Sequence, residues 1–394
     1  MAFVLLFILG FSIVSVAQTP ATGSTNTDLE KVASDLVNKC ANIKEGEIVF
    51  VSGGVKDLEL LENIAVNVRK TGAYPLVIIN SDRMTRKMYT EVPEKYDSQS
   101  PDLDMHLMKF VTTFISVPSN ETSDLLADIP PERFAKRSEA NEPILEMLQK
   151  NPIKMVELGN GMYPTKANAD EFGISLEKLT EIFWSGINVD YEKLAANGKK
   201  LESKLAGGNE LVITNKNGTN LTVNIAKSPA FCSDGIISAE DLKKGYAGSG
   251  VFLPAGEVYL APVAGSANGK VVIDNYSFMG KTIEGLVLEF KTGKLVSMNA
   301  KSEFDSLKKY YDAQGKGKDE FGLVDFGINP NVVIPAGSKL QAWMPAGMIT
   351  IGMGNNIWAG GSNDANSALN FFLPGCSVKV DGKTLVDNGN LKLQ

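Results

Sequence analysis

The chain has 394 residues, of which 43% are hydrophobic and 22% are charged, and its formal net charge is −7. This length and composition predict two globular domains with a sizeable core. A nucleic-acid backbone is excluded as the main partner, because such binding depends on clustered cations and the sequence contains no Lys/Arg run.

The first 17 residues form an uncharged apolar run that ends in Ser15, Val16 and Ala17. Small residues at this position suit signal-peptide cleavage, and the run is shorter than the ~20 residues that a membrane span needs. We therefore predict a signal peptide over residues 1–17, a Thr/Ser/Asn/Gly-rich linker over 18–27, and a secreted or periplasmic protein without a stable membrane span. An uncleaved anchor is the alternative, because the run lacks a basic start.

The next part of the chain alternates between predicted helices and strands. Apolar residues at helical spacing predict helices over 28–41 and 57–70, and short apolar runs predict strands over 47–52 and 74–79. This order indicates a βαβ unit, and hence a parallel sheet with helices on its faces. The alternation continues with strands over 110–117 and 153–158 and with helices over 142–150, 175–184 and 191–205.

From residue 208 onward the chain is rich in short β segments separated by Asn/Gly turns. One helix is predicted here, over 302–311. We place the boundary near Gly207, which gives an α/β domain over 28–207 and a mostly β, α+β-type domain over 208–394. The predicted strands cover 210–214, 220–225, 269–273, 285–290 and 377–380.

The sequence lacks the motifs that several common cofactor, metal and catalytic sites require. The pair Gly53 and Gly54 follows a predicted strand, but its surroundings match neither a dinucleotide fingerprint nor a Walker loop, so no nucleotide cofactor is expected. His106 is the only histidine and lies in an amphipathic helical stretch, which excludes an H-E-x-x-H zinc motif and argues against a histidine-based triad. The three cysteines contain no Cys-x-x-Cys pair and are interpreted as buried apolar residues.

An ordered series of segments resembles the thermophilic aminopeptidase family of metallopeptidases, of the aminopeptidase T and aminopeptidase S type. The resemblance covers nearly all of the mature chain, and it implies a dimeric two-domain enzyme that releases N-terminal residues from peptides with two divalent metals. The segments are residues 45–51, 128–133, 163–165, 179–184, 189–191, 234–242 and 253–259.

The resemblance implies a metal site of two glutamates, two histidines and an aspartate, with a nearby tyrosine. The first glutamate matches Glu257, and the second matches Asp325, which is shorter by one methylene. The first histidine and the tyrosine match Thr350 and Ile357. The family's His-x-Asp matches Leu369 and Phe371, neither of which has a lone pair to offer a metal.

Loss of three metal ligands predicts that the two-metal site is degenerate, because even changes outside the ligand set typically lower affinity ~10- to 100-fold. No catalytic residue is therefore assigned, no cofactor is expected, and Glu257 and Asp325 are the incomplete remainder of the metal site. An apolar surface that binds a peptide or small ligand is expected in its place. Its predicted members are Trp343, Ile357, Trp358, Leu369, Phe371 and Phe372. The alternative, which is the safer interpretation for any one of them, is an ordinary core residue of the β domain.

Other functions stay open at this point. An active aminopeptidase could use one or two divalent ions, Zn²⁺, Co²⁺, Mn²⁺ or Mg²⁺, in an oxygen-rich site at Glu257 and Asp325. Alternatively, Glu257 is a turn residue kept for local hydrogen bonding. A carboxylate pair acting on a glycoside is a third candidate, although no sugar-binding signature supports it.

Overall fold

The computed structural model describes residues 27–118, 121–122, 125–278, 281–365 and 367–393. The predicted signal peptide and all of the predicted linker except Thr27 lie outside these residues. Within the described part, no helix combines the length and apolar character needed to cross a bilayer.

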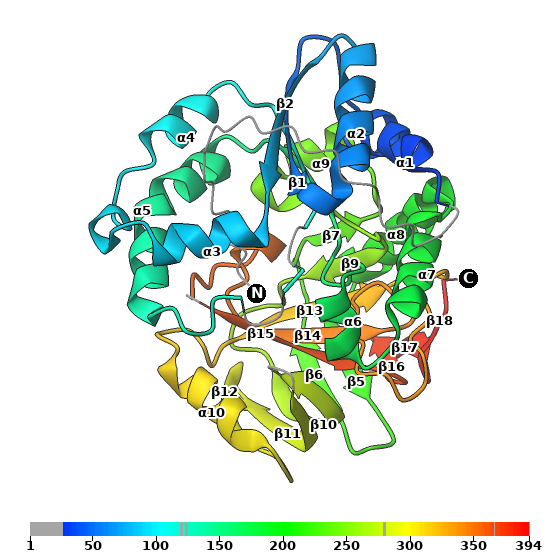
Figure 1. Ribbon diagram of the computed structural model, residues 1–394. Coiled ribbons are helices and arrows are strands. Elements are labelled where there is room, and N and C mark those ends of the chain that lie inside the picture. The colour runs from blue at the N-terminus through cyan, green and yellow to red at the C-terminus, as the bar shows by residue number, and fades with distance from the viewer. Residues whose placement is uncertain (1–26, 119–120, 123–124, 279–280, 366, 394) are drawn as a thin grey trace.

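A parallel sheet in the order β2-β1-β3-β4-β8 forms the first part of the protein (Figure 1). Helices cover both of its faces, as the βαβ pattern predicts. On one face, α2 packs its buried Leu60, Leu61 and Ile64 into the main core. The other face forms a second core around Phe50 and Phe114, whose rings stack 4.6 Å apart.

The predicted elements of this part are all present in the predicted order, but α3, α6 and β8 were not predicted, and α5 begins at Pro131 and not at residue 142. The strands are β1 (Ile48–Gly54), β2 (Tyr74–Asn80), β3 (Thr113–Ser116), β4 (Lys154–Leu158) and β8 (Gly250–Leu253). The helices are α1 (Leu29–Asp35, continued by a π turn over Leu36–Cys40), α2 (Leu58–Lys70), α3 (Asp82–Thr90), α4 (Asp102–Leu107), α5 (Pro131–Lys150), α6 (Lys166–Phe172), α7 (Leu176–Ile187) and α8 (Tyr191–Ala206).

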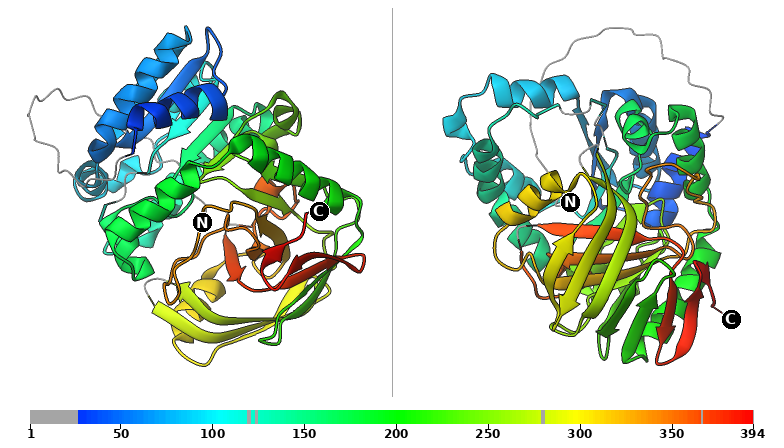
Figure 2. Two further views of the ribbon diagram at one scale, coloured as in Figure 1. Left: turned by 90° about the vertical axis from the view of Figure 1, so that its right-hand side faces the viewer. Right: turned by 90° about the horizontal axis from the view of Figure 1, so that it is seen from below.

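Two antiparallel sheets form the second part and pack face to face (Figure 2). Ring contacts between the sheets, such as Tyr276 to Phe371 at 5.1 Å, lie inside the sandwich. One sheet contains β12 (Lys294–Asn299), β11 (Lys281–Lys291), β10 (Asn268–Phe278), β6 (Asn220–Asn224), β5 (Glu210–Thr214), β16 (Ser377–Val380), β17 (Lys383–Asp387) and β18 (Asn390–Leu391). The other contains β15 (Ala368–Leu373), β14 (Ile349–Gly354), β13 (Phe321–Gly327), β9 (Glu257–Leu260) and β7 (Ala230–Ser233).

The predicted fold class, a parallel-sheet α/β part followed by a mostly β part, is confirmed. A division near Gly207 does not separate the sheets, however, because β8 follows it in sequence and pairs with β4 as the edge of the parallel sheet. Helix α10 (Phe304–Ala313) corresponds to the helix predicted over 302–311. The second part also contains a helix that was not predicted, α9 (Ala239–Lys243), which begins with a capping box between Ser238 and Asp241.

A three-residue corner joins the parallel sheet to the sandwich. β8 ends at Leu253, and β9 begins at Glu257 in the other sheet. Gly256 turns this corner with φ +125°, and its carbonyl accepts a hydrogen bond from the Ile328 N–H at 2.7 Å. A Cβ atom at Gly256 would lie 2.6 Å from the Cβ of Asn329, so both the backbone angle and the available space require glycine.

We expect Gly256→Ala to lower the free energy of unfolding by about 3 kcal/mol. The alanine would have to adopt a positive φ, and its Cβ atom would clash with Asn329. Chemical denaturation measures this change. Gly382→Ala is the matched control, since Gly382 also has positive φ (+78°) but has no atom within 4 Å of the added Cβ. Its expected loss is about 1 kcal/mol. Equal losses in the two variants would contradict the tight corner.

Candidate functional site

The corner places Glu257 against the carboxyl ends of the parallel strands. The side chain is 5% exposed. Its carboxylate accepts a hydrogen bond from the side-chain amide of Asn160, which follows β4 and also donates to the Pro254 carbonyl at 3.1 Å. Glu257 is therefore the first residue of a buried strand and connects the two parts of the protein, rather than a surface turn residue.

Asp325 and Thr350 lie on the same face of the five-stranded sheet as Glu257. Asp325 pairs with Tyr259 on one side and with Thr350 on the other, while Glu257 lies two residues before Tyr259 on β9. Residues directly opposite each other, or two apart on one strand, point to the same face. The structure thus brings together three of the positions that match the family's metal site.

Two polar side chains of this face, Asp325 and Thr350, lack hydrogen-bond partners among the described residues. Asp325 is 1% exposed, and neither of its carboxylate oxygens has a hydrogen-bond partner among the described residues. The Thr350 hydroxyl, also 1% exposed, has none either. Buried polar groups are normally paired, so an unpaired carboxyl at this depth indicates a functional site or the remainder of one.

Burial makes both carboxyl groups weak acids. It raises the pKa of Glu257 to about 8, against a smaller lowering by the Asn160 hydrogen bond, and the negative charge of Glu157 raises it further. Burial and then the charge of Glu257 raise the pKa of Asp325 well above its usual range. At neutral pH the folded protein therefore holds protons at this site.

The donor set does not fit a two-metal centre. Within the described residues, no group of three or more His, Cys, Asp and Glu side chains could hold a metal ion. The site offers two carboxyls and a hydroxyl, whereas zinc-like catalytic ions take nitrogen, sulfur or several carboxylate ligands in fixed geometry. His106 contributes nothing here, because it lies exposed on α4 of the first part.

Leu369 and Phe371 do not lie beside Asp325. Strand β15 turns both side chains into the sandwich core, where they are 7% and 0% exposed. The residue between them, Asn370, packs over Gly352. A Cβ atom added at Gly352 would lie 2.7 Å from the side-chain oxygen of Asn370 and 3.0 Å from the Cβ of Leu323. A match shifted by one residue exchanges the two faces of a strand, so Asn370 and its neighbour Ala368 occupy the site face.

An aromatic cluster adjoins the unpaired polar atoms, as the sequence predicts for Trp343, Trp358 and Phe372. Trp343 packs edge-on against Phe372 at 5.3 Å and against Trp358 at 6.4 Å. Trp358 in turn lies 5.2 Å from Tyr259. Phe372 pairs directly with Thr350, which links the cluster to the site. We call Tyr259, Trp343, Trp358 and Phe372 the aromatic cluster.

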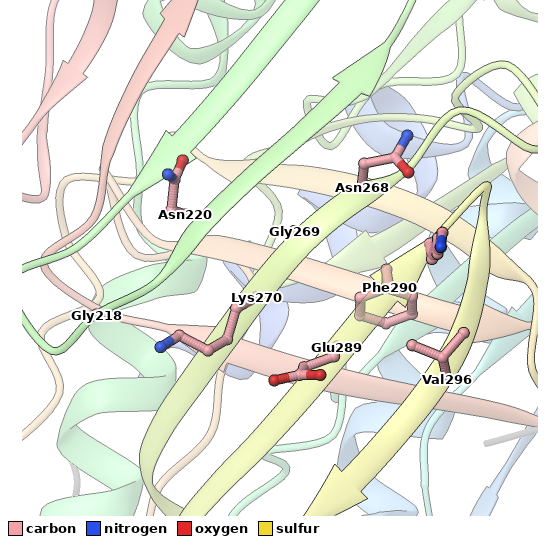
Figure 3. Close-up of a pocket in the computed structure, with 9 residues that line it drawn as sticks. Gly218, Asn220, Asn268, Gly269, Lys270, Glu289, Phe290 and Val296 are labelled. Carbon is pink, nitrogen blue, oxygen red and sulfur yellow. The ribbon is translucent and has the colours of Figure 1, made fainter.

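Leu369 and Phe371 were also predicted to belong to this apolar surface, but both face the sandwich core instead. The last predicted member, Ile357, begins the short 3-10 turn that carries Trp358 and is half-buried. A distinct groove of about 690 Å³ lies elsewhere, on the eight-stranded sheet (Figure 3). Asn220, Lys270 and Glu289 line it, and none of the carboxyl or aromatic residues described above does. It has no buried polar group aimed into it, so we assign it no role.

Comparison with known proteins identifies related sequences. The family model of the thermophilic metalloproteases (M29) matches residues 25–327. Aminopeptidase 2 of Geobacillus stearothermophilus is 25% identical over 304 residues, which are 72% of this chain and 73% of that protein. Aminopeptidase PepS of Streptococcus thermophilus is 24% identical over 300 residues, 69% of this chain and 70% of that protein.

Two solved structures share the fold. Wild-type AmpT from Thermus thermophilus has a TM-score of 0.71 and 18% identity, covering 92% of this chain and 98% of that one. A 2,5-dihydroxypyridine dioxygenase from Pseudomonas putida KT2440 has a TM-score of 0.61 and 14% identity, with 94% and 98% covered. Because AmpT and this dioxygenase share one architecture, the fold alone does not define the reaction.

The two buried carboxyls predict an unusual pH dependence of stability. The folded state holds protons that the unfolded state releases above its ordinary carboxyl pKa of ~4, so the free energy of unfolding should fall as pH rises toward about 8. Asp325→Asn should flatten this slope and raise stability at pH 8 by about 2 kcal/mol.

Urea denaturation across this pH range measures both effects, with the exposed Asp274→Asn as control. A destabilised Asp325→Asn variant at pH 8 would mean that the carboxylate is charged and has a partner, contrary to this description.

Proposed function

Because the chain belongs to the thermophilic metalloprotease (M29) family, we propose that it is a member that binds a peptide or small ligand and does not perform two-metal hydrolysis. The binding site is the face of the five-stranded sheet formed by Glu257, Asp325, Thr350 and the adjoining aromatic cluster. We further propose that the protein is exported, as the apolar run over residues 1–17 predicts.

One observation carries this proposal: Asp325 is 1% exposed, and its carboxylate has no hydrogen-bond partner in the part of the chain that the structure describes. In a working two-metal site, imidazoles and cations would surround such a group. Here its strand neighbour across β14 is Thr350, a neutral hydroxyl, and the nearby amide is Asn370. Neutral oxygen donors in place of imidazole support loss of the metal pair.

The aromatic cluster supports the binding half of the proposal. Trp343, Trp358 and Phe372 are only partly buried, although their rings contact one another. Binding sites commonly combine apolar and aromatic walls with a few fixed polar groups. The aminopeptidase names of the related sequences suggest a peptide as the ligand, with its apolar side chain against the cluster and its polar atoms at the buried carboxyls.

A working aminopeptidase with a rebuilt site is the second candidate. The observation that favours it is the position of Glu257 and Asp325 on one sheet face. Two carboxylates with neutral oxygens suit a hard ion such as Mg²⁺ or Mn²⁺ better than Zn²⁺.

Hydrolysis of leucine p-nitroanilide distinguishes the two candidates. We expect no turnover above background with added Zn²⁺, Co²⁺, Mn²⁺ or Mg²⁺, because the site lacks the ligands that would hold and activate such ions. Metal-dependent turnover that disappears in Glu257→Ala, and persists in the exposed control Glu284→Ala, would establish the second candidate instead.

Ligand binding is tested separately by calorimetry with the tripeptide Leu-Gly-Gly. Trp343→Ala should weaken binding about tenfold, since a buried aromatic contact typically contributes more than 1 kcal/mol. Tyr96→Ala, which removes a 49% exposed aromatic ring from the first part, should leave the affinity unchanged. Equal affinities in all three proteins would remove the aromatic cluster from the binding site.

A further inference from the structure

A half-buried asparagine on an edge strand adds a polar group to the proposed ligand site. Strand β15 is the edge of the five-stranded sheet and pairs with β14, so that Asn370 lies opposite Gly352 (Figure 1). A Cβ atom at Gly352 would lie only 2.7 Å from the side-chain oxygen of Asn370. The Asn370 side chain therefore leans inward over β14, toward the middle of the sheet, in space that a glycine leaves open.

The Asn370 carboxamide joins two groups that also lack partners. Thr350 precedes Gly352 by two residues on β14, so its side chain lies on the same face. Asp325 lies directly opposite Thr350 on β13. In the part of the chain that the structure describes, the side chains of Asn370, Thr350 and Asp325 make no hydrogen bond. Three neighbouring side chains thus have hydrogen-bonding capacity that a ligand can use.

The charges around these groups exclude an anion as their ligand. The residues that the five strands place on this face include two acids, Glu257 and Asp325, and no lysine, arginine or histidine. Lys244 reaches the edge of the face, 5.8 Å from the Phe231 ring, but its ammonium pairs with Glu202 at 3.0 Å. Phe231 lies on β7, two strands away from Asp325. A carboxylate or phosphate at Asp325 would therefore meet no cation among the described residues.

The asparagine also selects against a free ammonium group. An ammonium only donates hydrogen bonds, so at this site it would leave the NH₂ group of Asn370 without an acceptor. An amide carries an N–H and a C=O side by side. Its N–H suits a carboxyl oxygen of Asp325, and its carbonyl accepts from the NH₂ of Asn370 or the hydroxyl of Thr350. An unsatisfied donor in a desolvated site lowers affinity roughly tenfold or more, which favours the amide.

We propose that Asn370, together with Thr350 and Asp325, binds an uncharged amide of the ligand, so that the ligand is an N-acylated peptide and not a peptide with a free amino terminus. This inference rests on the proposed function, because it names the ligand class of the same site. The amide of the acyl group lies at the polar side chains. The first side chain of the peptide lies against the aromatic cluster, which begins at Phe372, the direct strand neighbour of Thr350.

Calorimetry at pH 7 with N-acetyl-Leu-Gly-Gly and Leu-Gly-Gly tests the ligand class, since the two peptides differ only in the acetyl group. We expect the acetylated peptide to bind at least tenfold more tightly, because its first nitrogen is an uncharged amide. Equal or tighter binding of Leu-Gly-Gly would overturn this inference and leave the proposed ligand site standing. Binding of neither peptide would overturn the proposed function, and this inference with it.

Asn370→Asp tests the residue itself. It keeps the shape of the side chain but replaces the NH₂ donor with an acceptor oxygen. We expect the acetylated peptide to lose at least tenfold in affinity, while Leu-Gly-Gly loses none. Asn275→Asp, at an exposed position on β10, is the matched control and should leave both affinities unchanged.

Asn370→Ala keeps the test decisive if the added carboxyl prevents folding. It removes the amide without adding a charge, and it should lower the preference for the acetylated peptide at least threefold. A wild-type preference in either folded Asn370 variant would overturn the assignment of Asn370 as the residue that determines specificity.

Discussion

The corner over residues 254–256 is the constraint on which the rest of the site depends. It allows the chain to leave the edge strand of the parallel sheet at Leu253 and enter an inner strand of a different sheet at Glu257. Asn329 secures this corner, because its side-chain amide donates to the Ala255 carbonyl at 2.6 Å and to the Gly186 carbonyl at 3.1 Å. A carboxylate is thereby fixed where the α/β part meets the sandwich.

The second feature is a polar face that its own surroundings do not satisfy. Burying a carboxylate without a partner is unfavourable by several kcal/mol, and protonation is the usual relief. Natural proteins keep such groups where they serve a ligand, an ion or a reaction. In this chain the unpaired group is next to partly buried aromatic rings and neutral oxygens, and the proposal of a bound peptide or small ligand rests on this combination.

The order of elements could be predicted from the sequence, because helical and strand periodicities are local properties. β8 could not be assigned to the parallel sheet in this way, since its partner β4 lies about 90 residues earlier and pairing at that distance leaves no local pattern. The buried strand that begins at Glu257 was equally ambiguous from sequence, because a glycine-rich segment precedes it. The capping box at Ser238, by contrast, was a readable signal for α9.

The site itself was predictable only in part. The family resemblance groups Glu257, Asp325 and Thr350, and the structure places all three on one face of the five-stranded sheet. The match at Leu369 and Phe371 could not be placed on the correct face from sequence, because a shift of one residue moves every side chain of a strand to the other face. The pairing of Gly352 with Asn370 in the structure shows that Asn370 faces the site.

Metal stoichiometry tests the central claim most directly. The purified protein would be equilibrated with Zn²⁺, Co²⁺ or Mn²⁺, passed through a desalting column and analysed by elemental mass spectrometry alongside Glu257→Ala. We expect less than one retained ion per chain, with no difference between the two proteins. Two retained ions per wild-type chain, lost in Glu257→Ala, would contradict it and show that oxygen donors alone have rebuilt the metal site.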